Sequence, residues 1–288
     1  MPLNPTVSYV QQLFQPLNDD AATFPSRKAL SSELHKFIKP RHSSHQNFSI
    51  NVNNDTVKKF GSAAVEMWHR AIHSYLTSAS LTKTSPLWAS VSGYYSSHYT
   101  VRAFAHILGY FQLFKDKKIV HLDLSNFTCD YSKKNGNERE HKFYWQVVNN
   151  NPLFKTNPFF TNNEEEHSTT FGELVSDSGH RSIANYADHI NNFPTFNVLN
   201  EADLISRLEK ISGLDLSDAP IPRIERYPDL DNVQVIAFQR LVAFRGFLDE
   251  TIGTTNRFWK RHRNPSWVPD YFDFQFIKPE YITIYKSA

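Results

Sequence analysis

Residues 87–111 read LWASVSGYYSSHYTVRAFAHILGYF, an otherwise apolar run that carries two adjacent tyrosines, two histidines and one arginine. Its apolar positions recur every three or four residues, and they form one stripe: Leu87, Val91, Tyr94, His98, Val101, Ala105 and Leu108. This spacing predicts a helix with one buried face. Pro86 stands just before the run, where the first turn of a helix tolerates proline.

A second long helix is predicted directly upstream. It begins after Asn54 or Asp55, either of which can cap it. Its apolar residues again recur at steps of three or four: Phe60, Ala64, Met67, Ala71 and Tyr75. A break rich in Thr and Ser separates the two helices, so we expect an antiparallel pair at about 55–80 and 86–114.

The pattern changes after the second helix. KIVHLDLSNFTCDY and HKFYWQVV are rich in β-forming residues, and Asn135-Gly136 between them is a strong tight-turn signal. The sequence therefore predicts a β-hairpin at about 118–150 with a charged tip. The expected fold class is mainly α, a helical bundle with a β-hairpin insertion.

Three segments are expected along the chain. Residues 1–54 should form a short helix and an irregular lead-in, and residues 55–213 the helical core with its hairpin. Residues 214–288 should comprise a Pro-rich linker, a helix and an aromatic segment, which either pack on the same core or form a separate lobe. Further helices are predicted at roughly 179–189, 201–212 and 232–251.

Composition excludes several classes of function. The formal net charge is +2, which identifies no partner by itself. The single cysteine excludes a disulfide framework and a thiolate zinc site. No Gly-rich phosphate loop, signal peptide or membrane-spanning stretch is present. We therefore expect a cytoplasmic protein that contacts no membrane and needs neither metal nor cofactor.

The run SGYYSSHYTVRAFAHILGYF, preceded by a long amphipathic helix, resembles the core of the HEPN superfamily. The resemblance covers roughly residues 55–190 and implies a HEPN-like antiparallel helical bundle. Many members are metal-independent ribonucleases of bacterial toxin–antitoxin and phage-defence systems, while others bind RNA or a partner protein without cleaving. The resemblance therefore implies an RNA-directed protein, acting as a homodimer or with a partner protein of the same system.

The family's catalytic pattern is an arginine followed four to six residues later by a histidine. The candidate here is HRSIANYADHI, which supplies Arg181, Asn185, Tyr186 and His189. By the resemblance, Arg181 would stabilise the scissile phosphate, Asn185 would position it, and Tyr186 or His189 would move protons. Tyr186 stands where the family has histidine, and tyrosine is a poor base near neutrality.

Two residues of the quoted helix would line the same cleft. Tyr95 and Arg102 share one helical face with Tyr99 and His106, because steps of four, three and four stay in register. That face is expected to be solvated or to contact a partner. His98 lies on the apolar stripe instead and is expected to be a hydrogen-bonded core histidine.

A basic segment near the C-terminus, TTNRFWKRHRNPSW, is a second candidate for contact with RNA. Its proposed RNA-binding residues are Arg257, Trp259, Lys260, Arg261, His262 and Arg263. Clustered cations neutralise phosphates, and Phe258 and Trp259 would offer stacking surfaces. The alternative is a solvated helix end, where Lys and Arg are favoured by the helix dipole.

Two other functions stay open. Asp130 and the run Glu140-His141-Lys142 resemble the Asp…Glu-x-Lys arrangement of metal-dependent restriction-type nucleases. This interpretation requires that the carboxylates of Asp130 and Glu140 face each other across a hairpin. The alternative is that these residues form a charged, solvated turn without a catalytic role. A non-catalytic helical protein-interaction subunit is also possible from the sequence, and it would leave a hydrophobic helix face open.

Overall fold

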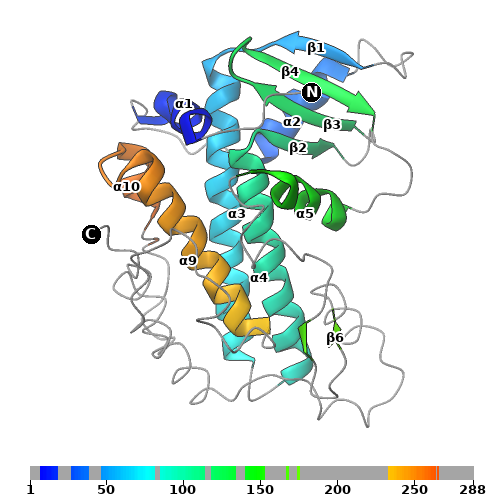
Figure 1. Ribbon diagram of the computed structural model, residues 1–288, viewed down its shortest axis with the longest axis vertical. Coiled ribbons are helices and arrows are strands. Elements are labelled where there is room, and N and C mark those ends of the chain that lie inside the picture. Colours follow the sequence, from blue (N-terminus) through cyan, green and yellow to red (C-terminus); the bar gives the residue numbers. More distant parts are fainter. Residues whose placement is uncertain are drawn as a thin grey trace.

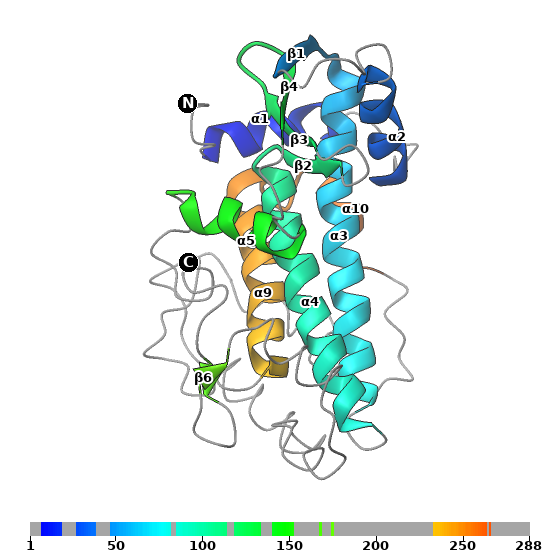
Figure 2. The ribbon, with the colours of Figure 1, turned by 90° about the vertical axis from the view of Figure 1, so that its right-hand side faces the viewer.

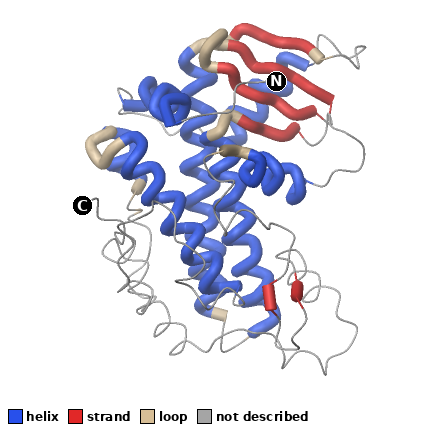
Figure 3. The backbone as a smooth tube through the Cα atoms, in the orientation of Figure 1, coloured by secondary structure: helices blue, strands red, loops and turns tan. Residues whose placement is uncertain are grey.

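The computed structural model describes residues 7–18, 27–38, 47–81, 85–113, 118–133, 140–152, 167–168, 174–175, 233–263 and 265. Most of them are helical. The helices are α1 (Val7–Asn18), α2 (Arg27–Ile38), α3 (Asn54–Ser80), α4 (Pro86–Ile107), α5 (Glu140–Asn150), α9 (Val233–Ile252) and α10 (Arg257–His262). The strands are β1 (Phe48–Asn51), β2 (Tyr110–Leu113), β3 (Lys118–Asp123), β4 (Thr128–Lys133), β5 (His167–Ser168) and β6 (Leu174–Val175). Figure 3 shows that β1–β4 gather at one end of the helical body.

The predicted pair of long helices is confirmed. Helix α3 begins after Asn53, whose side chain accepts a hydrogen bond from the Thr56 backbone N–H at 3.2 Å. Helices α3 and α4 lie side by side along the molecule (Figures 1 and 2), and small polar side chains join them. The Ser96 hydroxyl donates to the carbonyl of Ala71 at 2.9 Å, and the Ser78 hydroxyl to that of Ala89 at 2.6 Å.

Helix α4 ends earlier than predicted, at Ile107 rather than near residue 114. The cause is Gly109, which has φ +82°, a left-handed conformation that favours glycine. A Cβ at Gly109 would lie 2.0 Å from the Tyr9 hydroxyl oxygen, so no larger residue fits there. The chain then turns into strand β2, which the sequence pattern did not indicate.

The sheet is larger than the predicted hairpin. Four antiparallel strands lie in the order β1-β4-β3-β2, with Phe48 paired to Tyr131 and Tyr110 paired to His121. The real hairpin joins β3 to β4 through residues 124–127, where Phe127 has φ +51°. Strand β1 falls within the segment expected to be an irregular lead-in. That segment also holds two helices rather than one.

The prediction that HKFYWQVV is a strand is wrong, because these residues belong to helix α5. The helix buries Phe143, Tyr144, Trp145 and Val148. Tyr144 and Val148 are one helical turn apart, so both can face the same neighbour. The aromatic and β-branched composition suggested a strand, and tertiary packing overrides it. The Asn135-Gly136 turn lies outside the described residues.

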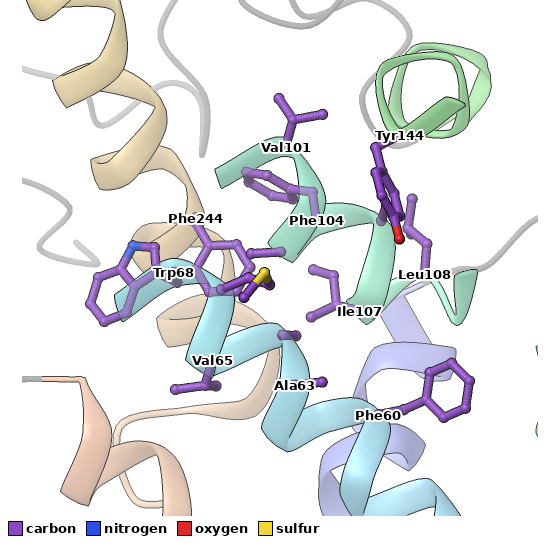
Figure 4. Close-up of a cluster of buried hydrophobic side chains, with 14 of the residues drawn as sticks. Phe60, Ala63, Val65, Trp68, Val101, Phe104, Ile107, Leu108, Tyr144 and Phe244 are labelled. Atoms are coloured by element: carbon purple, nitrogen blue, oxygen red, sulfur yellow. The ribbon is translucent and has the colours of Figure 1, made fainter. Parts of the chain in front are cut away.

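One hydrophobic core joins the N-terminal, central and C-terminal helices. Trp68 of α3 is fully buried in this core, and its ring lies 5.9 Å from that of Phe244 of α9 (both are drawn in Figure 4). The Trp68 indole N–H donates to the Leu241 carbonyl at 3.1 Å. Helices α9 and α10, the described part of residues 214–288, therefore share the core of α3 and α4.

In the part of the chain that the structure describes, every helix is too short or too polar to cross a membrane. The helix predicted at 232–251 is confirmed as α9. The helices predicted at 179–189 and 201–212, and the Pro-rich linker, lie outside the described residues.

Candidate nucleic-acid interface

Helix α10 is fixed at its start by contacts with its own first turn and with α1. The Asn256 side chain caps it by accepting a hydrogen bond from the Trp259 backbone N–H at 3.0 Å. The Arg257 backbone N–H donates to the Asn18 side chain at 2.8 Å. Helix α10 therefore sits beside the C-terminal end of α1 (Figure 1), in a fixed orientation.

The aromatic side chains of α10 point inward. Trp259 is 0% exposed and Phe258 is 4% exposed. The Trp259 ring lies 5.4 Å from Trp68, and the Phe258 ring lies 6.4 Å from Phe14. The expectation that Phe258 and Trp259 offer stacking surfaces to RNA is wrong, because both rings are part of the core.

Asp249 on α9 holds the far end of α10. Its carboxylate accepts a hydrogen bond from the Trp259 indole N–H at 2.6 Å and forms a salt bridge with Arg263. Arg245 lies 3.7 Å from the same carboxylate. Burial, together with the nearby Arg263, lowers the pKa of Arg245 to about 10 even though Asp249 opposes the shift. Arg263 is thus engaged within the protein rather than displayed on its surface.

The opposite face of α10 carries three exposed cations, Arg257, Lys260 and Arg261. They lie within one helical turn, where residues three and four apart are neighbours. The surface continues onto α3, because the His69 ring nitrogen Nε2 lies 2.8 Å from the His262 carbonyl oxygen. Next to His69 is Arg70, whose side chain is 53% exposed and pairs with Glu66.

His262, also on α10, is not part of this group of exposed cations. Burial, the neighbouring His69 and Arg261 together lower its pKa to about 4, so it is neutral near pH 7. Its ring packs 4.7 Å from Phe258. Arg257 and His262 are five residues apart, or about 140° around a helix, so their side chains leave α10 in different directions.

Arg102, predicted to contact RNA, and His106, one turn beyond it on α4, lie in a different setting. Arg102 is only 6% exposed, and its guanidinium lies 4.8 Å from the centre of the Tyr144 ring. His106 is fully buried, and its Nδ1 lies 2.8 Å from the Tyr110 carbonyl oxygen. Burial, Arg102 and Arg27 lower the pKa of His106 well below its usual value. The expectation of a solvated or partner-facing face is wrong for both residues.

The tyrosines on the same helix are less enclosed. Tyr95 and Tyr99 are half-buried, with rings 5.9 Å apart. His98 is buried, as expected, and stacks 6.3 Å from Tyr94. Tyr95 thus keeps partial exposure, whereas Arg102 beyond it is covered by α5.

The structure does not bear on the predicted catalytic set. Arg181, Asn185, Tyr186 and His189 lie outside the described residues. The restriction-type arrangement can be addressed: Asp130 lies on β4, but Glu140 is the first residue of helix α5. The proposed pairing of Asp130 and Glu140 across a hairpin is therefore wrong. Within the described segments, no group of three or more His, Cys, Asp or Glu side chains could hold a metal ion.

Sequence reasoning missed the residues that orient this surface. Asp249 is ten residues from Trp259 on another helix, and Asn18 is more than two hundred residues from Arg257. Only the spacing of Arg245 and Asp249, one turn apart, was a local sign of a polar contact. Comparison with family models, curated proteins and solved structures gave no match.

Proposed function

We propose that this protein binds RNA through the exposed cations of α10, as a HEPN-like component of a bacterial defence or toxin-type system. The observation that carries the proposal is the division of α10 into two faces. Phe258 and Trp259 anchor the helix in the core, while Arg257, Lys260 and Arg261 are exposed. Such clustered cations bind phosphates by releasing condensed counterions.

The charge of the surface is local rather than general. The whole chain has 31 Lys and Arg against 29 Asp and Glu, so net charge attracts RNA weakly. Asp249 is engaged by the Trp259 indole N–H and by Arg263. The exposed charged side chains of α10 are Arg257, Lys260 and Arg261.

The competing proposal, a protein-interaction subunit, expects an open hydrophobic face. In the described residues, the exposed large hydrophobic side chains are Val7, Trp88 and Phe127. They lie on α1, on α4 and in the β3–β4 turn, so they form no contiguous row along one element. Isolated exposed side chains of this kind are normal on soluble proteins, so the described elements show no open hydrophobic face.

The test is binding to labelled tRNA by the wild type and by the variant R257Q/K260Q/R261Q. Removing three phosphate contacts should weaken binding by at least about tenfold at moderate salt. The matched control is K28Q/K36Q/K133Q, which removes the same charge from exposed positions on other elements. An equal loss in both variants, or no binding by the wild type, would contradict the proposal.

Whether bound RNA is cleaved is a separate proposal that rests on the family resemblance. Arg181 would then stabilise the scissile phosphate, with Asn185, Tyr186 and His189 beside it. Cleavage of tRNA in EDTA by the wild type and not by Arg181→Ala would support metal-independent catalysis. Binding without cleavage would favour a non-catalytic RNA binder.

A further inference from the structure

Helices α4 and α5 and strand β2 contribute to an internal cluster of polar side chains that the proposed RNA surface does not use. Tyr144 of α5 (drawn in Figure 4) contacts the other members. The Arg102 guanidinium lies 4.8 Å from the centre of its ring, and the His106 ring lies 5.6 Å away. Its hydroxyl oxygen accepts a hydrogen bond from the Gln112 backbone N–H at 3.1 Å. All four residues are at most 6% exposed, so the cluster is almost closed to solvent.

Two members of the cluster have buried polar atoms that need a partner. The His106 Nδ1 lies 2.8 Å from the Tyr110 carbonyl oxygen, which can only accept, so Nε2 of the neutral ring is an acceptor. In the part of the chain that the structure describes, this Nε2 and both polar atoms of the Gln112 side chain have no hydrogen-bond partner. Buried polar groups in this state are rare and costly, and a bound molecule satisfies them.

The surroundings of His106 are positively charged. Arg102 lies one helical turn before it, and the guanidinium of Arg27 on α2 lies 5.6 Å from the Phe111 ring, against which His106 stacks at 5.0 Å. Burial and the two arginines lower the pKa of His106, so its ring is neutral near pH 7. Guanidinium groups bind the oxygens of phosphates and carboxylates, so these surroundings favour an anion.

The hydrogen-bonding groups of the cluster narrow the choice of anion. The Tyr144 hydroxyl accepts from Gln112 and keeps its own proton for donation, and the Gln112 amide adds further N–H donors. Nε2 of His106, by contrast, accepts. Hydrogen phosphate has oxygens that accept from these donors and a P–OH group that donates to Nε2. Sulfate has the same shape but carries no proton near pH 7, so it leaves Nε2 unpaired.

We propose that the internal cluster of Arg102, His106, Gln112 and Tyr144 binds hydrogen phosphate as a small free ion. Arg102, Tyr144 and the Gln112 amide hold the phosphate oxygens, and His106 accepts from the P–OH group. A small ion fits this position better than an RNA backbone, because the four residues are almost closed to solvent. The site lies on other elements than the cations of α10 and goes beyond the proposed RNA binding.

The experiment is isothermal titration calorimetry of the full chain with inorganic phosphate and, separately, with sulfate, at constant ionic strength and about pH 7. The wild type should bind about one phosphate per chain with a Kd below about 1 mM. Sulfate should bind at least about tenfold more weakly, because Nε2 stays unpaired. Equal binding of the two ions would overturn the inference. Binding of neither ion would also overturn it, and buried water would then satisfy the polar atoms.

Tyr144→Phe keeps the ring over Arg102 and removes one donor, so it should weaken phosphate binding at least about tenfold. The matched control is Tyr131→Phe on β4, because Tyr131 is 1% exposed and its hydroxyl also bonds a backbone group, the Leu34 carbonyl at 3.1 Å. Equal losses in the two variants would overturn the inference.

The variant R257Q/K260Q/R261Q separates this site from the RNA surface. It should bind phosphate as the wild type does, whereas Tyr144→Phe should bind tRNA as the wild type does. Loss of phosphate binding in R257Q/K260Q/R261Q would assign the ion to α10 and overturn the inference. Loss of tRNA binding by the wild type would refute the proposed function and leave the phosphate site standing.

Discussion

Helices α4 and α10 each carry an arginine and a histidine beside aromatic residues, yet they place these cations in opposite environments. On α4, Arg102 and His106 lie beneath Tyr144 and away from solvent. On α10, the aromatic residues are buried and Arg257, Lys260 and Arg261 are exposed. The same residue types thus build an interior polar cluster in one helix and a charged surface in the other.

The difference comes from what surrounds each helix. Helix α4 packs against α3, α5 and α9, so an arginine on any of these faces is covered. Helix α10 is six residues long and packs along one side, against α1 and the core. Composition alone therefore does not determine which arginine can meet a ligand.

The largest expected effect concerns neighbouring residues of α10. Trp259→Ala should lower the free energy of unfolding by about 3–5 kcal/mol, because it leaves a cavity beside Trp68 and removes a hydrogen bond to Asp249. Lys260→Ala should change it by less than about 0.5 kcal/mol. Denaturant titration measures both, and similar values would contradict the two-faced description of α10.

The second prediction compares the arginines of the two helices. Arg257→Gln should weaken RNA binding several-fold with little effect on stability, because its side chain is exposed. Arg102→Met should lower stability by about 1–3 kcal/mol and leave the RNA affinity of the folded protein unchanged. Loss of affinity in Arg102→Met at full folding would place Arg102 in the binding surface.

The two long helices could be predicted from the sequence, but the short strand β1 could not. The periodicity of Phe60 to Tyr75 and of Leu87 to Leu108 predicts α3 and α4, because long helices repeat their pattern many times. Strand β1 is four residues long and pairs with β4 about eighty residues later, so no local signal marks it.

For the candidate site, the cations could be predicted and their orientation could not. Phe258 and Trp259 lie about 100° apart on the helix, opposite the cations, but the pattern does not say what covers the aromatic face. The contacts that decide the orientation come from Asp249, Asn18 and Trp68, on three other helices. Such contacts follow from the tertiary arrangement, which a single sequence does not reveal.

Asp249→Asn should change the RNA affinity by a smaller amount, and the direction of that change is informative. The substitution removes a negative charge, so simple electrostatics would strengthen RNA binding. Because Asp249 positions α10 through Trp259 and Arg263, we expect weaker binding, by about two- to fivefold, and a stability loss of about 1–3 kcal/mol. Tighter binding would show that charge, rather than the orientation of α10, governs the affinity.

The last prediction concerns the pH dependence of stability and the buried cluster of α4. The pKa of His106 is lowered in the folded state, so the unfolded chain binds the proton more readily. Stability is therefore complete above the unfolded pKa of about 6.5 and falls below it, by at most about 1.4 kcal/mol per pH unit for one histidine.

His106→Gln should reduce this dependence between about pH 7 and 5, and part of it should persist because the pKa values of His69, His121 and His262 are also lowered. Unfolding titrations across that range measure the slope. An unchanged slope in His106→Gln would contradict the burial of a neutral His106 beside Arg102.

The most direct test of the central claim is the salt dependence of tRNA binding by the wild type and by R257Q/K260Q/R261Q. Each lost phosphate contact reduces the slope of log affinity against log salt by about 0.9, so the variant should have a slope shallower by about 2 to 3. The control K28Q/K36Q/K133Q should keep the wild-type slope. Identical slopes for the wild type and R257Q/K260Q/R261Q would show that the cations of α10 do not bind RNA.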